Sequence, residues 1–314
     1  MGGSGASISI VIPTRDAGRA FGTVLHRIMG QGLAPLEILV VDAGSQDGTR
    51  HIVSQFPDAR FVESPVSAGP ATWNFACLQA RGELVVFLSQ DSVPADGDWL
   101  KHLAAGLEDP SVGAAYGRQE AAVGSDPIIA HRLARRFPEE AASRRARFGD
   151  PVTYASLTFS IDNAAIRRTA FKGIHFNEHL HVGADRAWAR QVLLASYTVA
   201  YVPAAVVERA VHHTLSKAWK EAILTGWTDE YLDGDGGTME LRAIGSGWKE
   251  AWQLVGGWHW DRLPFLALED AVRRYGYKLG HRLHRLAPSI RGRIAPDIAM
   301  EEPHRPLTER EKAA

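Results

Sequence analysis

The sequence of 314 residues contains a single cysteine, Cys77. One thiol cannot form an internal disulfide framework or supply a cysteine-built zinc or iron–sulfur site, and it is typical of a reducing compartment. We therefore expect a cytoplasmic location. The formal net charge is only −1, so the chain has no overall field that would gather nucleic acid, and no nucleic-acid partner is expected.

Long apolar runs are also absent. The longest uncharged stretch near the middle, residues 192–207, is interrupted by polar residues and a proline. It falls short of the ~18–20 apolar residues that a membrane span needs. Residues 1–7, MGGSGAS, lack the basic and apolar regions of a signal peptide, and we interpret them as an expression remnant outside the fold.

Three common signatures are missing: G-x-G-x-x-G after a strand, the Walker A loop and the G-x-S-x-G elbow. Their absence argues against dinucleotide oxidoreductases, P-loop enzymes and α/β-hydrolases. In their place, short β-branched runs alternate with helical patterns. Strands are predicted at residues 8–13, 36–42, 60–64 and 83–89, with helices between them that begin near Ala20, Ser45 and Pro70. Such a βαβαβαβ order predicts a parallel sheet covered by helices on both faces.

Polar residues stand where the predicted strands end, namely Thr14 and Arg15, Asp42, and Asp91. Ligands of open α/β sheets bind outside the carboxyl ends of the strands, so these side chains should meet at one edge. Aspartates there suit a divalent cation and a nucleotide better than a covalent nucleophile.

The pattern is less regular after residue 110. An arginine-rich region at 132–147 fits either a helix pair or a loop. A helix is expected at 185–195 and a strand at 197–207, and a glycine-rich hinge follows at 233–237. We therefore predict a catalytic domain at residues 8–235 and a helical C-terminal extension at 236–314.

Five stretches in order resemble glycosyltransferase family 2, whose members are inverting enzymes with a GT-A fold. They are VIPTRDAG at 11–18, VVDAGSQDGT at 40–49, SAGPATWN at 67–74, RGELVVFLSQDSVP at 81–94 and GADRAWARQV at 183–192. The middle region is most similar to the bacterial rhamnosyltransferase branch, through LSQDSVPADGDWL, VGAAYGRQEA and FSIDNAAIRR. The resemblance implies an α/β GT-A fold, Rossmann-like, with a mostly parallel sheet.

The resemblance implies a nucleotide site at Pro13, Thr14, Arg15, Asp42 and Gln90. Asp42 is expected to bind the imide N–H of uracil or thymine. Its alternative role is to stabilise a turn before the next helix, because Asp and Ser favour such positions. The family often has an acid where Ala43 stands.

Asp91 is expected to bind Mg²⁺ or Mn²⁺, which neutralises charge on the departing diphosphate. The adjacent Gln90 stands in place of an acid. Asp185 is expected to be the general base that removes the proton of the acceptor hydroxyl. The alternative for Asp185 is a helix N-cap, and Ala184 stands where the family usually has Glu.

The remaining candidates are assigned more generally. His212 is expected at the metal and His213 at the phosphates, although the order of the two stays open. Arg118 and Asn163 are expected near acceptor or phosphate groups, and Asn163 and Asp162 are expected where hydroxyls of the acceptor or the donor are bound. Arg15 is a second candidate for the phosphates.

Residues 271–296 carry seven Lys and Arg and no acid, close to several tryptophans. Such a segment fits either a peripheral contact with the inner membrane face or a helical annex packed on the rest of the protein.

The sequence therefore predicts a metal-dependent glycosyltransferase. Its expected donor is dTDP-L-rhamnose first and a UDP-sugar second, and its expected acceptor is a glycan or a polyprenyl-linked glycan. The alternative is a catalytically silent scaffold that binds a sugar nucleotide or a glycan.

Overall fold

The computed structural model describes nine segments of the chain. They are residues 6–66, 68–139, 145–147, 158–180, 182–210, 214–233, 251–252, 255–256 and 260–294. The chain divides into two compact units. The first comprises residues 1–125, 132–178 and 184–211, and the second comprises 126–131, 179–183 and 212–314.

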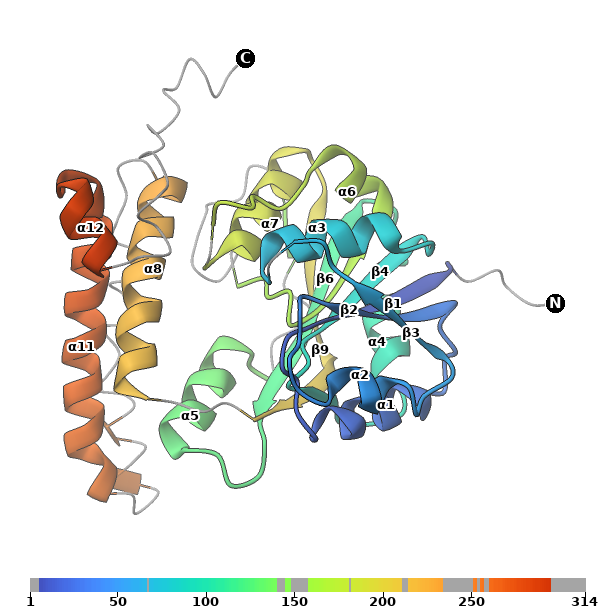
Figure 1. Ribbon diagram of the computed structural model, residues 1–314, viewed down its shortest axis with the longest axis horizontal. Helices are drawn as coiled ribbons and strands as arrows, with labels where there is room; N and C mark the ends of the chain where they lie inside the picture. Colours follow the sequence, from blue (N-terminus) through green and yellow to red (C-terminus); the bar gives the residue numbers. More distant parts are fainter. Residues whose placement is uncertain are drawn as a thin grey trace. The chain divides into compact units, whose positions relative to one another are not determined.

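A nine-stranded sheet forms the centre of the first unit, in the order β3-β2-β1-β4-β8-β6-β9-β5, with β7 beside β9 (Figure 1). The strands are β1 (Ile8–Thr14), β2 (Glu37–Asp42), β3 (Ala59–Glu63), β4 (Leu84–Leu88), β5 (Ser92–Pro94), β6 (Val112–Ala121), β7 (Arg145–Ala146), β8 (Asn163–Arg167) and β9 (Thr198–Arg209). The first four strands in this order pair in parallel, as predicted. Beyond β4 the sheet is mixed, because β8 is antiparallel to both β4 and β6.

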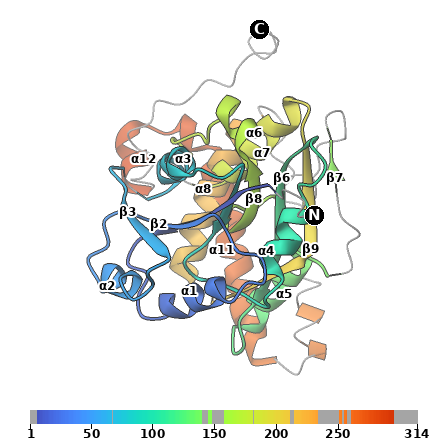
Figure 2. The same ribbon diagram turned by 90° about the vertical axis from the view of Figure 1, so that its right-hand side faces the viewer.

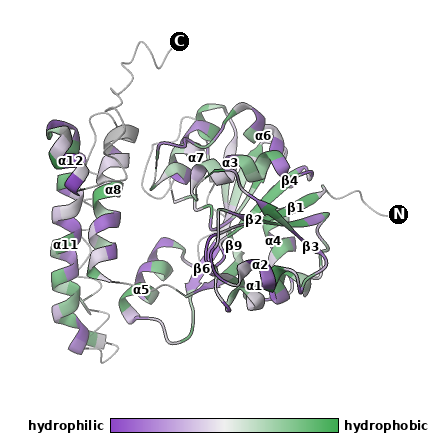
Figure 3. Cartoon of the chain, viewed as in Figure 1, coloured by the Kyte–Doolittle hydropathy of each residue, from purple (hydrophilic) through white to green (hydrophobic). Residues whose placement is uncertain are grey.

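Helices cover both faces of this sheet, as Figures 1 and 2 show. One face holds α1 (Phe21–Met29), α2 (Thr49–Val53) and α4 (Trp99–Ala105), and the other holds α3 (Pro70–Gln79), α6 (Arg168–Gly173) and α7 (Ala184–Leu194). Successive strand residues point to opposite faces, so Ile10 and Ile12 pack with the first helices and Val11 with the second. Both faces are therefore apolar, and the central strands are strongly hydrophobic in Figure 3.

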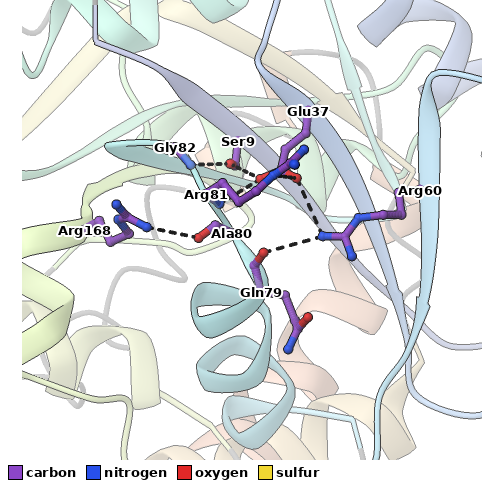
Figure 4. A network of polar contacts seen from close by, with 8 residues as sticks. All are labelled: Ser9, Glu37, Arg60, Gln79, Ala80, Arg81, Gly82 and Arg168. Atoms are coloured by element: carbon purple, nitrogen blue, oxygen red, sulfur yellow. Dashed lines mark hydrogen bonds and ion pairs between the residues drawn. The ribbon is translucent and has the colours of Figure 1, made fainter.

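A buried carboxylate joins the beginnings of β1, β2 and β4 (Figure 4). Glu37 accepts hydrogen bonds from Ser9 Oγ at 2.7 Å and from the backbone and side chain of Arg81 at 2.7 and 3.0 Å. Gly82 N in turn donates to Ser9 Oγ at 2.8 Å. Burial raises the pKa of Glu37, but these hydrogen bonds and the charge of Arg81 together lower it by more. The net pKa therefore lies below its ordinary value. The ionised carboxylate thus fixes the relative positions of three strands.

The second unit contains two long helices, α8 (Leu215–Asp233) and α11 (Leu263–His281), which lie side by side. Their backbones approach closely at glycines. A Cβ on Gly280 would lie 2.0 Å from Ile223 O, and one on Gly226 would lie 2.2 Å from Tyr277 O. Buried Tyr277 donates to Asp229 at 3.2 Å beside this contact.

The predicted domain boundary at residue 235 falls after α8, whereas α8 belongs to the second unit. The sequence pattern at 233–237 indicates only that a helix ends there. The contact of α8 with α11 is made through glycines, which add no apolar stripe from which the contact could be predicted. Two shorter helices are α5 (Pro127–Arg136) and α12 (Pro288–Ile294). Among the described helices, none has the length and hydropathy of a bilayer span.

We expect Gly280→Ala to destabilise the protein by about 1–3 kcal/mol, because the new methyl group meets backbone atoms and forces α8 and α11 apart. Gly173→Ala is the matched control, since a Cβ there has no atom within 4 Å. Thermal unfolding followed by circular dichroism measures both variants. Equal melting temperatures for the Gly280 variant and the wild type would contradict the close contact.

Candidate functional site

A cleft of about 240 Å³ opens at the carboxyl ends of β1 and β4. Its walls include Pro13 and Thr14 at the end of β1 with Arg15 after it, Ser89, Gln90 and Asp91 after β4, Gly69 and Trp73 at the start of α3, and Ile161 and Asp162 before β8. The structure therefore brings together five of the residues that the sequence assigned to nucleotide and metal. Parallel pairing of β1 with β4 accounts for this convergence.

Gln90 links the two sides of the cleft. Its Oε1 accepts from Arg15 N at 2.8 Å, and its Nε2 donates to Arg15 O at 3.1 Å. A carboxylate at this position could accept the first bond but could not donate the second. Gln90 therefore holds the backbone of the β1–α1 loop beside the β4 loop that carries Asp91.

Asp91 is exposed, and its carboxylate accepts no hydrogen bond from any described residue. Among the described residues, no three His, Cys, Asp or Glu side chains gather into a metal cluster. Mg²⁺ is usually held by one or two carboxylates together with substrate phosphates and water. One unengaged aspartate in a cleft fits that type of site.

Asp42 lies at the end of β2 and is only 5% exposed. Its carboxylate accepts hydrogen bonds from Thr14 Oγ1 at 3.1 Å, from the backbone N–H groups of Gly44 and Ser45, and from the Ser45 hydroxyl. These bonds fit the alternative of a turn-stabilising aspartate. Contact with a nucleobase stays a prediction, and it requires Asp42 to share an oxygen that is already hydrogen-bonded.

Asp185 lies in the first turn of α7 and is half-buried. Its carboxylate accepts from Arg186 N at 2.8 Å and from Ile161 N at 3.3 Å. Burial raises the pKa of Asp185 above its ordinary value; the charges of Arg136 and Arg186 oppose the rise, and the carboxylate of Asp162 adds to it. The group is therefore more basic than a surface aspartate and lies directly behind a wall of the cleft.

The prediction that Asn163 contacts a substrate is wrong. Its side chain is fully buried and makes three hydrogen bonds: it accepts from Trp99 Nε1 at 2.9 Å and donates to Arg118 O at 3.0 Å and Ala205 O at 2.9 Å. The amide joins β8 to its neighbours in the sheet and to α4. An asparagine beside an aspartate in sequence gave no sign of which side chain faces the core.

Arg118 is not among the residues that line the cleft. Its guanidinium is mostly buried and forms ion pairs with Glu120 at 3.0 Å and Glu139 at 3.2 Å. A phosphate contact would therefore have to compete with two carboxylates. His212 and His213 lie outside the described residues.

The sheet order and the helices on both faces define a GT-A-like fold, and a polar cleft lies at the carboxyl ends of β1 and β4. A family model described as glycosyl transferase family 2 matches residues 9–174, more than half of the chain. The chain belongs to this family and is a hexosyltransferase.

Curated relatives cover most of the chain. The O-antigen chain rhamnosyltransferase RfbN of Salmonella typhimurium is 29% identical over 87% of this chain and 89% of its own length. The O-antigen chain rhamnosyltransferase WbaN of Salmonella anatum is 26% identical over the same shares.

Solved structures share the fold at lower identity. The mannosyltransferase PcManGT from Pyrobaculum calidifontis, in complex with GDP-Man and Mn²⁺, is 18% identical with a TM-score of 0.59, over 88% of this chain and 87% of that one. S. aureus TarS 1-349 in complex with UDP-GlcNAc is 16% identical with a TM-score of 0.56, over 89% of this chain and 91% of that one.

We expect Gln90→Glu to lower the free energy of unfolding by about 1–2 kcal/mol at neutral pH, because the glutamate cannot donate to Arg15 O and places two acceptors together. Gln55→Glu on the exposed surface is the matched control. Urea unfolding measures both. A Gln90 variant as stable as the control would show that the second bond to Arg15 contributes nothing.

Proposed function

We propose that this protein is a metal-dependent inverting glycosyltransferase that transfers a sugar from a nucleoside diphosphate to a glycan or a lipid-linked glycan. The supporting observation is a cleft lined both by Asp91 and by Ile161, whose backbone N–H donates to the Asp185 carboxylate. The proposed donor is dTDP-L-rhamnose, followed by UDP-sugars. RfbN and WbaN, which resemble the chain over most of its length, are rhamnosyltransferases.

The nucleotide is proposed to lie along the edge formed by Pro13, Thr14 and Arg15. Arg15 supplies a cation for the phosphates, and its backbone is fixed by Gln90. Asp42 accepts a hydrogen bond from Thr14 Oγ1 and is proposed to contact the base. The structural neighbours that contain GDP-Man or UDP-GlcNAc bind sugar nucleotides on the same fold.

Asp91 is proposed to hold Mg²⁺ or Mn²⁺, with His212 as a further ligand. A divalent cation bound there supplies positive charge that stabilises the departing diphosphate. The acceptor hydroxyl oxygen forms the new bond to the anomeric carbon as the bond from that carbon to the diphosphate oxygen breaks. Asp185 takes the hydroxyl proton. Its raised pKa makes it a better base near neutral pH than an ordinary aspartate.

We expect Asp185→Asn to reduce kcat by about 100- to 10,000-fold, the usual range for loss of a general base, while nucleotide binding is retained. A transfer assay and calorimetry on the same preparation measure the two quantities. In the wild type, kcat/KM should fall as the pH drops through the pKa of Asp185, at a higher pH than an ordinary aspartate would give. An Asn variant with full transfer activity would remove Asp185 from the reaction.

The same experiment distinguishes the silent scaffold, whose support is that Ala43, Gln90 and Ala184 stand where acids are common in the family. A scaffold would bind nucleotide and transfer no sugar in the wild type. Asp58→Asn, an exposed aspartate outside the cleft, is the matched control for the change of charge.

The outer face of α11 is proposed to contact the inner membrane surface from the cytoplasm. Leu268 and Tyr275 are 51% and 72% exposed there. Arg274 and Lys278 are also exposed, and the exposed Arg282 follows directly after the helix. Of the two acids on α11, Glu269 is buried and ion-paired with Arg273, and Asp270 is only half-exposed. A helix surface that carries aromatic and basic side chains and no exposed acidic one favours binding to anionic lipid.

We expect the protein to sediment with vesicles that contain phosphatidylglycerol but not with phosphatidylcholine vesicles, and 0.5 M salt should release it because salt screens the charges. Lys278→Glu with Arg282→Glu should abolish sedimentation. The control pair is Arg27→Glu with Lys101→Glu in the first unit. Equal sedimentation of the two double variants would contradict a specific role for α11.

A further inference from the structure

Asp162 lies in the wall of the cleft but has no part in the reaction described above. Two hydrogen bonds fix its place. Its own backbone oxygen accepts from Ser89 N at 3.0 Å, two residues before Asp91. The neighbouring Ile161 N donates to the Asp185 carboxylate at 3.3 Å. The short segment of Ile161 and Asp162 therefore connects the proposed metal loop with the proposed base.

The two oxygens of the Asp162 carboxylate have different surroundings. Oδ2 accepts from Arg209 Nη1 at 2.8 Å and from Ser160 Oγ at 3.3 Å. Oδ1 accepts no hydrogen bond from any described residue, and the side chain is 34% exposed. One oxygen is thus held by protein groups while the other is available to a ligand in the cleft.

Arg209 holds Asp162 in a fixed orientation. It lies at the end of β9, and the same Nη1 that binds Asp162 also donates to Gln119 Oε1 at 2.9 Å. Gln119 is buried in β6. A guanidinium anchored in this way limits the rotation of the neighbouring carboxylate.

We propose that Asp162 Oδ1 accepts a hydrogen bond from a ring hydroxyl of the donor sugar, with Arg209 as the positioning residue. This inference rests on the proposed glycosyltransferase function. In the proposed function the diphosphate lies near Asp91 and the acceptor hydroxyl lies near Asp185. The sugar between them therefore lies next to the segment of Ile161 and Asp162. An ionised carboxylate is acceptor-only, so it selects a hydroxyl over a carbonyl or a second carboxylate.

The test is calorimetric binding in Mn²⁺ of dTDP and of dTDP-L-rhamnose, with UDP and UDP-GlcNAc as the second pair, to the wild type and to Asp162→Asn. The variant should bind the sugar nucleotide about 10- to 100-fold more weakly and the nucleotide alone with unchanged affinity, because a hydrogen bond to a charged group is lost only on the sugar. Arg209→Lys, which keeps the charge but not the fork geometry, should give a smaller loss of the same kind.

Donor analogues that lack one ring hydroxyl each complete a double-mutant cycle. One analogue should bind the wild type and Asp162→Asn equally, because the hydroxyl and its acceptor form one interaction. Equal loss of nucleotide and sugar-nucleotide affinity in the variant, or undiminished sugar-nucleotide affinity, would overturn the assignment. A wild type that neither binds nor transfers any sugar nucleotide would instead defeat the proposed function, and that result is visible before any variant is made.

Discussion

The site depends on the parallel pairing of β1 with β2 on one side and β4 on the other. Parallel strands end at the same edge, so the residues that follow β1 and β4 meet although about 75 positions separate them in sequence. The Glu37 carboxylate fixes the beginnings of these strands, and Gln90 joins the loops at their ends. Polar contacts therefore fix the beginnings of three strands and the ends of β1 and β4, and Asp91 follows Gln90 at this edge.

The other half of the cleft has a different origin. Because β8 is antiparallel to β4, Asn163 at its start pairs with Leu88 at the end of β4. The residues that precede β8 are thereby placed at the same edge as the residues that follow β4. Asn163 fixes this arrangement through its buried amide, and its neighbour Asp162 faces the cleft. One reversed strand thus adds a second carboxylate to an edge formed by parallel strands.

Sequence patterns predicted the first four strands, which are short β-branched runs, and the helices between them. They also placed Arg15, Gln90 and Asp91 together, since polar residues after buried strands meet in a parallel sheet. The same rule says nothing about residues before an antiparallel strand. Asp162 was therefore named only together with Asn163, and Asn163 was given the wrong role. The arginine-rich region overlaps the end of α5 and contains β7, which is too short to show a period. The contact of α8 with α11 depends on glycines, which carry no hydrophobic signal.

The central claim is that the edge formed by β1 and β4 binds a nucleoside diphosphate together with a divalent cation. Calorimetric titration of dTDP, UDP and GDP, each with and without Mn²⁺, into the wild type and Asp91→Asn tests it most directly. The account predicts tight binding of dTDP or UDP only with Mn²⁺, and loss of the Mn²⁺ effect in the variant without a change in melting temperature. Binding that is independent of Mn²⁺ or unchanged by Asp91→Asn, or the absence of binding by all three nucleotides, would contradict it.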